Sequence, residues 1–272
     1  MPRPIRINFE NAYYHVMNRG GGHQTIFHGD DYYQSFLACL EGASGRFRLE
    51  VIAYCLMGNH YHLFVKTPLA NLDRCMRHVN GLYTQCYNRM KKTDGPLFRG
   101  RYKAILVEAD AYGLQLSRYI HRNPVDMKRP LVDKLEDYRW SSYPCYINKT
   151  ERPNCLYCDL VYDLLGAEQR YVAYARYVGL GLGLDDETES FYGKGNQSAI
   201  LGGGNFVELV KYELGEKKQL IDQYQGNYPS INAIIEAVAG ELCVEAKEIV
   251  KSRRGLAVRI SLDGLGYICV VS

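Results

Sequence analysis

Long apolar runs are missing from this sequence of 272 residues: none reaches the roughly 18 residues that a membrane-spanning helix needs. The first residues, Met-Pro-Arg-Pro-Ile-Arg, also lack the apolar core of a secretory signal peptide. We therefore expect a cytoplasmic protein. With 47% hydrophobic and 23% charged residues, the chain has the composition of a soluble globular protein that forms one large domain or two.

A disulfide framework is absent as well. The nine cysteines are an odd number and are scattered, and several lie in apolar segments, as Cys39, Cys55 and Cys86 do. This pattern is typical of reduced cysteines in a protein core. Cys155 and Cys158 have the spacing of a metal-binding pair, but no second Cys or His pair lies at zinc-finger distance, so the sequence favours a structural role for both.

The net charge of +3 conceals an asymmetry between the two halves of the chain. Residues 1–150 hold 21 lysines and arginines against 13 acidic residues, whereas residues 151–272 hold 12 against 17. The basic half also holds 14 of the 24 tyrosines. Basic side chains interleaved with aromatic rings suit a surface that tracks phosphates and stacks unpaired bases, so this half is a candidate for nucleic-acid binding.

The segment from Val51 to Thr67 predicts two adjacent strands joined by a tight turn at Gly58-Asn59. His60 and His62 follow that turn. Because side chains alternate along a strand, both imidazoles leave the same face, about 7 Å apart, close enough to hold one metal ion. A chance pair of histidines in a buried strand is the alternative, so a third ligand and a reacting group are needed to decide.

The remaining patterns predict an α+β fold. The first half alternates strand, helix, strand, strand, helix, strand, helix, which is typical of a ferredoxin-like antiparallel sheet. Proline residues near 144 and 153 indicate a boundary, so we expect a domain at 1–150 and a smaller, all-helical region at 151–272. The predicted segments are a strand at 11–18, helices at 30–44 and 72–91, a basic loop leading into a strand at 98–107, a helix from 110 to Pro124, helices at 156–177, 206–224, 231–239 and 244–250, and a loop at 179–204.

The helix before Pro124 carries the candidate reacting group. Tyr119 and Asn123 are four residues apart and share one face. An amide oxygen binds hard divalent ions, so Asn123 could complete a metal site with His60 and His62 if the helix packs beside their strand. Tyr119 could then attack a phosphodiester. A packed core tyrosine is the alternative for Tyr119, and Tyr112 is a rival nucleophile on nearly the same face.

Four segments together resemble a known family. Residues 57–63 are similar to the histidine, bulky residue, histidine (HUH) motif of single-strand DNA nucleases. Residues 119–125 resemble the tyrosine helix of single-tyrosine, IS200-like transposases, most closely the REP-associated tyrosine transposases of bacteria, and residues 14–20 and 98–107 resemble that family's first strand and basic loop. The resemblance implies an HUH nuclease fold, Mg²⁺ or Mn²⁺ on His60, His62 and Asn123, and DNA whose 5′ end is held on Tyr119.

The resemblance also implies a partner and a set of contacts. We expect single-stranded or hairpin DNA near the bacterial nucleoid, and relatives act either as monomers or as homodimers. The residues expected to touch DNA are Asn18, Arg19, Arg99, Arg101, Lys103, Arg118 and Arg122. Residues 231–260 are similar to the first helices of the duplex-reading domain of the replication initiator DnaA, but the expected recognition helix would fall where the sequence stops, so duplex reading is not predicted.

Three functions remain open from the sequence. The leading one is a transposase that cleaves and joins single-stranded DNA through a covalent phosphotyrosine. The second is a protein of the same descent that grips DNA hairpins without chemistry. The third is a metal-dependent phosphodiesterase that uses activated water and a structural tyrosine.

Overall fold

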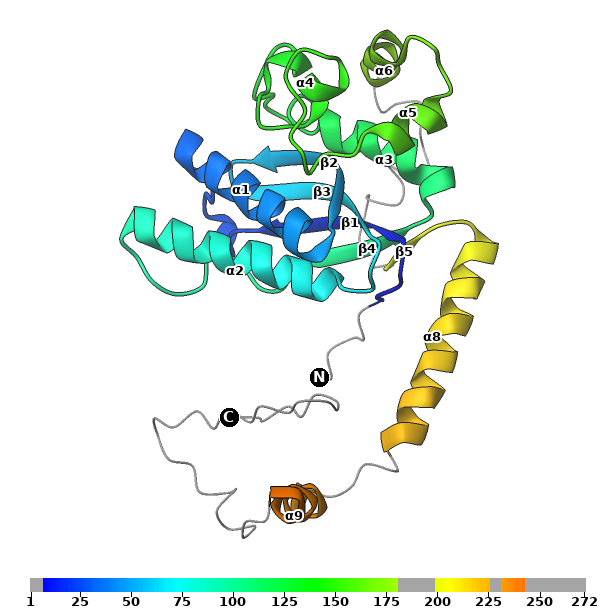
Figure 1. The fold of residues 1–272 in the computed structure, drawn as a ribbon. Helices are drawn as coiled ribbons and strands as arrows, with labels where there is room; N and C mark the ends of the chain where they lie inside the picture. The colour runs from blue at the N-terminus through cyan, green and yellow to red at the C-terminus, as the bar shows by residue number, and fades with distance from the viewer. Residues whose placement is uncertain (1–6, 181–198, 226–230, 243–272) are drawn as a thin grey trace. The chain divides into compact units, whose positions relative to one another are not determined.

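The computed structural model describes residues 7–180, 199–225 and 231–242. Its first part has the order of strands and helices that the sequence predicts (Figure 1): β1 (Ala12–Arg19), α1 (Asp30–Phe47), β2 (Glu50–Met57), β3 (His60–Thr67), α2 (Leu72–Lys91), β4 (Lys103–Val107) and α3 (Ala109–Arg122). The later described elements are α4 (Tyr143–Tyr146), α5 (Asp159–Leu165), α6 (Arg170–Gly179), β5 (Ile200–Leu201), α8 (Gly204–Gln225) and α9 (Ile231–Leu242).

Within the described residues, the strands form one sheet in the order β2-β3-β1-β4-β5. β1 lies antiparallel between β3 and β4, and β2 pairs antiparallel with β3. This is the ferredoxin-like arrangement of a split β-α-β fold, so the predicted fold class is confirmed.

The short strand β5 corrects the predicted loop at 179–204. Ile200 and Leu201 pair in parallel with the edge of β4, where the amide N atoms of Leu106 and Glu108 each donate to a carbonyl of the added segment at 2.8 Å. Two apolar residues thereby complete backbone hydrogen bonds that the edge of β4 would otherwise leave to water. Residues 181–198 of the predicted loop lie outside the described residues.

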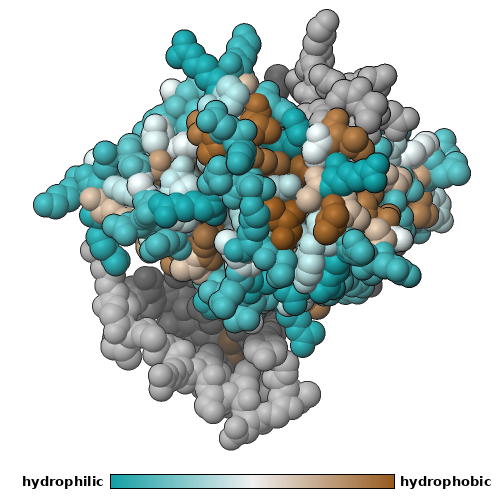
Figure 2. Space-filling view, turned by 90° about the horizontal axis from the view of Figure 1, so that it is seen from above, coloured by the Kyte–Doolittle hydropathy of each residue, from teal (hydrophilic) through white to brown (hydrophobic). Residues whose placement is uncertain are grey.

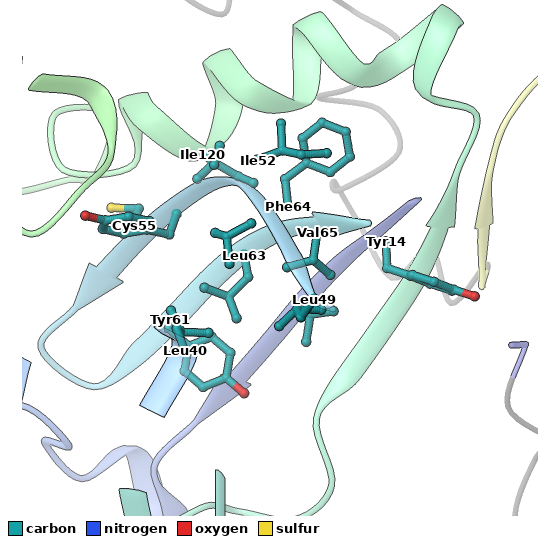
Figure 3. Close-up of a cluster of buried hydrophobic side chains, with 14 of the residues drawn as sticks. Tyr14, Leu40, Leu49, Ile52, Cys55, Tyr61, Leu63, Phe64, Val65 and Ile120 are labelled. Carbon is teal, nitrogen blue, oxygen red and sulfur yellow. The ribbon is translucent and has the colours of Figure 1, made fainter. Parts of the chain in front are cut away.

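Helices cover both faces of the sheet. α1 and α2 pack together on one face, and α3 crosses the other (Figure 1). Successive residues of β3 therefore point into different layers. Phe64, with Ile52 and Ile120, lies between the sheet and α3, whereas Tyr61 lies with Leu40 on the opposite face (Figure 3).

The helix predicted at 156–177 is in fact two helices, α5 and α6, which both contact α3. The break follows Gly166, whose φ of 63° is a left-handed conformation that glycine adopts without strain and that ends α5. α5 and α6 form a second layer over α3, which therefore has protein on two sides.

Two compact units divide the chain, Met1–Leu214 and Gly215–Ser272. The first unit continues past residue 150, where the sequence predicts a domain boundary: the amide N of Val51 on β2 donates to the carbonyl of Cys155 at 3.0 Å. In the second unit, the described residues are the end of α8 and α9, which matches the helix predicted from Ile231. The helix predicted at 244–250 lies outside the described residues.

The surface and the cysteines fit the expectations from composition. Seen from the side that α4, α5 and α6 cover, hydrophobic residues are broken into groups by hydrophilic ones (Figure 2). Among the described residues, no helix has the length and apolar content to cross a bilayer. The described cysteines are free, and Cys155 and Cys158 are buried, which raises the pKa of each thiol to about 11.

Tyr174 on α6 tests whether residues beyond 150 belong to the same folding unit as the sheet. Its side chain is fully buried, and its hydroxyl lies 2.6 Å from His121 Nδ1 and donates to Ser117 Oγ at 3.0 Å, both on α3. We expect Tyr174→Ala to lower the free energy of unfolding by about 3–5 kcal/mol because it leaves a cavity. Tyr174→Phe should cost about 1–3 kcal/mol because His121 Nδ1 loses its hydrogen-bond partner in the core.

Urea unfolding followed by circular dichroism measures both values. Tyr157→Ala is the control, since Tyr157 is 42% exposed and its removal should change stability by at most about 0.5 kcal/mol. A Tyr174→Ala protein as stable as this control would separate α6 from the folding unit of the sheet.

Candidate active site

The pairing of β1 with β3 builds the base of the site. Arg19 lies opposite His60, and Met17 lies opposite His62. Directly opposed residues of an antiparallel pair project from the same face, and that face is the one that α3 covers. The rings of His60 and His62 lie 5.1 Å apart between centroids, so the structure places the predicted pair together.

His15 forms a third member of this histidine cluster. Its Nε2 lies 2.9 Å from Nδ1 of His62, and the two rings stack with centroids 5.1 Å apart. His15 is fully buried, and His62 is 7% exposed. Burial lowers the pKa of His15 to about 3, with the charge of Lys103 adding to the effect, and it lowers the pKa of His62 well below its ordinary value. Both rings are therefore neutral at physiological pH.

Tyr119 on α3 packs against this cluster. Its ring centroid lies 5.8 Å from that of His62 and 5.9 Å from that of His15. Burial raises the pKa of the phenol above its ordinary value, while a hydrogen bond to Asn123 acts in the opposite direction. The rival Tyr112 lies two helical turns earlier, about 10.5 Å along the helix axis. The structure thus brings Tyr119 to the histidines.

Asn123, the residue immediately after α3, lies one turn beyond Tyr119. Its Nδ2 donates to the Tyr119 carbonyl at 2.8 Å, which fixes the amide and leaves Oδ1 as the atom that can accept or ligate. In the described ranges there is no cluster of three or more His, Cys, Asp or Glu side chains that could hold a metal. Two imidazole nitrogens and an amide oxygen are a donor set that can hold a divalent metal ion and leaves positions for phosphate oxygens.

Basic residues flank the histidines on the same face of the sheet. Arg19 is opposite His60, and its charge, after burial, contributes to lowering the pKa of His60. Lys103 on β4 is opposite Met17 and is exposed. Arg99 is exposed too, and its amide N donates to the Arg19 carbonyl at 2.9 Å. Arg19 and Lys103 therefore lie on the face of the histidine pair, and Arg99 lies beside the end of β1 at Arg19.

Asn18 and Arg101 belong to the other face. A groove of about 710 Å³ opens there beside α2, lined by residues that include Asn18, Arg77, Asn80, Phe98, Arg101 and Tyr102. Asn18 is only 9% exposed, and its Nδ2 donates to the Gly100 carbonyl at 3.3 Å. Its side chain therefore anchors the loop that carries Arg99 and Arg101, whereas Arg101 itself is exposed.

Arg118 and Arg122, two further predicted DNA contacts, bind other parts of the protein. Arg118 is 2% exposed, and its guanidinium lies 4.3 Å from the ring centroid of Tyr177 on α6. Arg122 forms a two-pronged ion pair with Asp126, at 2.6 and 2.9 Å, and donates to the Val178 carbonyl at 2.9 Å. The helical layer of α5 and α6, which the sequence does not reveal, turns both arginines into links between α3 and α6.

Sequence reasoning missed His15 and Asn59 as parts of the site. Asn59 Oδ1 lies 2.7 Å from Nδ1 of His60, just as His15 contacts Nδ1 of His62. The alternation along β1 puts His15 on the face opposite Tyr14 and Val16. That signal becomes informative only once β1 is known to pair with β3 in this register.

A comparison with protein families matches the first part of the chain. Residues 8–123 fit the family model described as "Transposase IS200 like". The match shows that this part of the chain is similar to IS200-like transposases. That part contains β1 through α3, and therefore all of His15, His60, His62, Tyr119 and Asn123. The family consists of transposases, which are DNA-processing enzymes.

Two solved structures are similar to this chain. One is a structure of the REP-associated tyrosine transposase bound to a REP hairpin, with 14% identity, a TM-score of 0.48, and coverage of 59% of this chain and 93% of that one. The other is a crystal structure of a protein assigned as a transposase from Deinococcus radiodurans, with 16% identity, a TM-score of 0.32, and coverage of 44% and 97%. No curated protein matches the chain.

The different burial of the arginines can be measured without DNA. We expect phenylglyoxal to modify Arg99 and Arg101 of the transposase domain rapidly, and Arg118 at least about tenfold more slowly, because Arg118 reacts only when the layer of α6 over α3 opens. Peptide mapping by mass spectrometry gives the three rates. In urea the three arginines should react alike. Equal rates in the native protein would mean that Arg118 is accessible.

Proposed function

We propose that this protein is a metal-dependent transposase that cleaves and joins single-stranded DNA at hairpin elements through a covalent 5′-phosphotyrosine on Tyr119. The observation that carries the proposal is the packing of the Tyr119 ring on the His62 and His15 rings, beside His60, within a segment of the IS200-like family. The proposed nucleophile on α3 thus lies against the face of the sheet that carries the two imidazoles.

In the proposed reaction, the Tyr119 Oη attacks the phosphorus of a phosphodiester. The bond between phosphorus and the 3′ oxygen breaks, the phenolic proton is lost, and the leaving oxygen is released as a 3′ hydroxyl. Attack of a 3′ hydroxyl on the phosphotyrosine reverses the step and joins two ends. Each step exchanges one phosphate ester bond for another, so the reaction needs no nucleoside triphosphate as an energy source.

His60, His62 and Asn123 would hold Mg²⁺ or Mn²⁺ through two imidazole nitrogens and the Asn123 Oδ1. When bound, the ion supplies positive charge that polarises the phosphodiester and stabilises the charge that develops on its oxygens. The protein's own contribution is to keep both imidazoles neutral by burial and to orient the Asn123 amide through its bond to the Tyr119 carbonyl. Arg19 and Lys103 add cations on the same face for the DNA backbone.

The role of Tyr119 is tested by the covalent adduct. Hairpin DNA with single-stranded flanks and Mn²⁺ should give a protein–DNA band that survives denaturing electrophoresis, and a perfect duplex should give none. Tyr119→Phe should abolish the band with little change in hairpin affinity, because only the hydroxyl is lost. Tyr112→Phe is the matched control and should keep it.

The outcomes of that assay separate the competing functions. If the adduct is lost in Tyr112→Phe and kept in Tyr119→Phe, the nucleophile is Tyr112 and the assignment of Tyr119 is wrong. Cutting without any adduct would favour attack by activated water, and hairpin binding by the wild type with neither cutting nor adduct would indicate a binding protein whose chemistry is idle.

The metal ligands are tested by isothermal titration with Mn²⁺ in the absence of DNA. We expect His60→Ala and His62→Ala each to remove measurable binding, because a site of two nitrogens and one oxygen keeps too few ligands after either loss. His78→Ala, on α2, is the control and should bind as the wild type does. Full adduct formation in excess chelator would rule out the metal.

A further inference from the structure

The Nδ1 atoms of both candidate metal ligands are engaged within the protein. His60 Nδ1 lies 2.7 Å from Asn59 Oδ1, and His62 Nδ1 lies 2.9 Å from His15 Nε2. An imidazole can bind a metal only through a nitrogen that carries a lone pair. In each ring, therefore, Nε2 is the atom that remains for an ion.

The tautomer of His60 follows from its partner. Asn59 Nδ2 donates to the His23 carbonyl at 3.4 Å, which assigns Oδ1 to the side that faces His60. A carbonyl oxygen only accepts hydrogen bonds, so Nδ1 of His60 carries the proton. In a neutral ring the lone pair then lies on Nε2.

The bond between His62 and His15 joins two nitrogens and allows two directions. If His15 Nε2–H donates to Nδ1 of His62, the lone pair of His62 is used and its Nε2 carries a proton. If His62 Nδ1–H donates, His62 Nε2 has its lone pair and His15 must itself carry its proton on Nδ1. Only the second direction makes His62 a ligand of the same kind as His60.

We infer that His15 is a positioning residue that accepts the Nδ1 proton of His62, and so holds His62 in the tautomer and ring orientation that present Nε2 to the metal. His15 is suited to this role because it is fully buried and its ring is stacked on His62 and edged by Tyr119. Asn59 Oδ1 accepts the Nδ1 proton of His60 in the same way. The inference rests on the proposed function, since it assigns a role toward the ion that His60 and His62 would hold.

The first measurement uses the wild-type protein without metal or DNA. Imidazole ¹⁵N chemical shifts distinguish the two neutral tautomers, and we expect His60 and His62 both to be protonated on Nδ1, as is His15. A His62 ring protonated on Nε2 would overturn the inference. This readout requires no variant and no activity.

The second measurement is the affinity for Mn²⁺ of variants without DNA. His15→Phe keeps a ring and removes the acceptor, and it should weaken Mn²⁺ binding about 10–100-fold, as loss of a partner behind a ligating histidine does. His15→Gln offers an amide oxygen as acceptor and should recover part of that loss. In His15→Phe the ¹⁵N shifts of His62 should report a mixture of tautomers.

His28→Phe is the matched control. The substitution removes another histidine whose ring nitrogen contacts a side chain, since His28 Nε2 lies 3.0 Å from the Tyr87 hydroxyl on α2. Because His28 is not part of the histidine cluster, the Mn²⁺ affinity should be unchanged. Failure of the wild type to bind Mn²⁺ would contradict the proposed function. Wild-type binding with equal affinity in His15→Phe would contradict only the role of His15.

Discussion

The register between β1 and β3 is the constraint on which the site depends. It sets Arg19 opposite His60 and Met17 opposite His62, and it brings His15 diagonally beside His62. A slip of one residue would move every side chain of one strand to the other face, so that His15 would point into the layer of α1 and α2. The same backbone bonds that build the sheet therefore assemble the histidine cluster.

The second constraint is the protein on both sides of α3. Its inner face packs on β2 and β3, and its outer face packs on α5 and α6. His121 on α3 lies 2.6 Å from the Tyr174 hydroxyl on α6 and 2.7 Å from Ser142 Oγ just before α4, and these buried contacts hold the helix in place. A helix held from two sides keeps the Tyr119 ring in place, which the proposed role of Tyr119 as a nucleophile requires because small displacements from attack geometry are costly.

Burial and charge act together in the cluster. Burial lowers the pKa of the three histidines, and the nearby cations Arg19 and Lys103 lower those of His60 and His15 further. Neutral rings can bind a cation, whereas protonated ones would repel it. The same cations can attract a phosphate, so the charges that keep the rings neutral for the proposed metal also favour the proposed DNA substrate.

The sequence by itself determined much of this protein. The alternation of strand and helix patterns gave the ferredoxin-like fold, because hydrophobic periodicity is local and strong over β1 to α3. The spacing of His60 with His62 and of Tyr119 with Asn123 identified the candidate site residues, of which His60, His62 and Tyr119 are joined by ring contacts in the structure. The tertiary structure alone decided the rest. Only the tertiary structure shows that Arg118 and Arg122 bind α6, and that His15 lies beside His62 once β1 pairs with β3. Which side chains are covered and which meet across strands depends on contacts between residues far apart in the chain, and local pattern carries no information about those contacts.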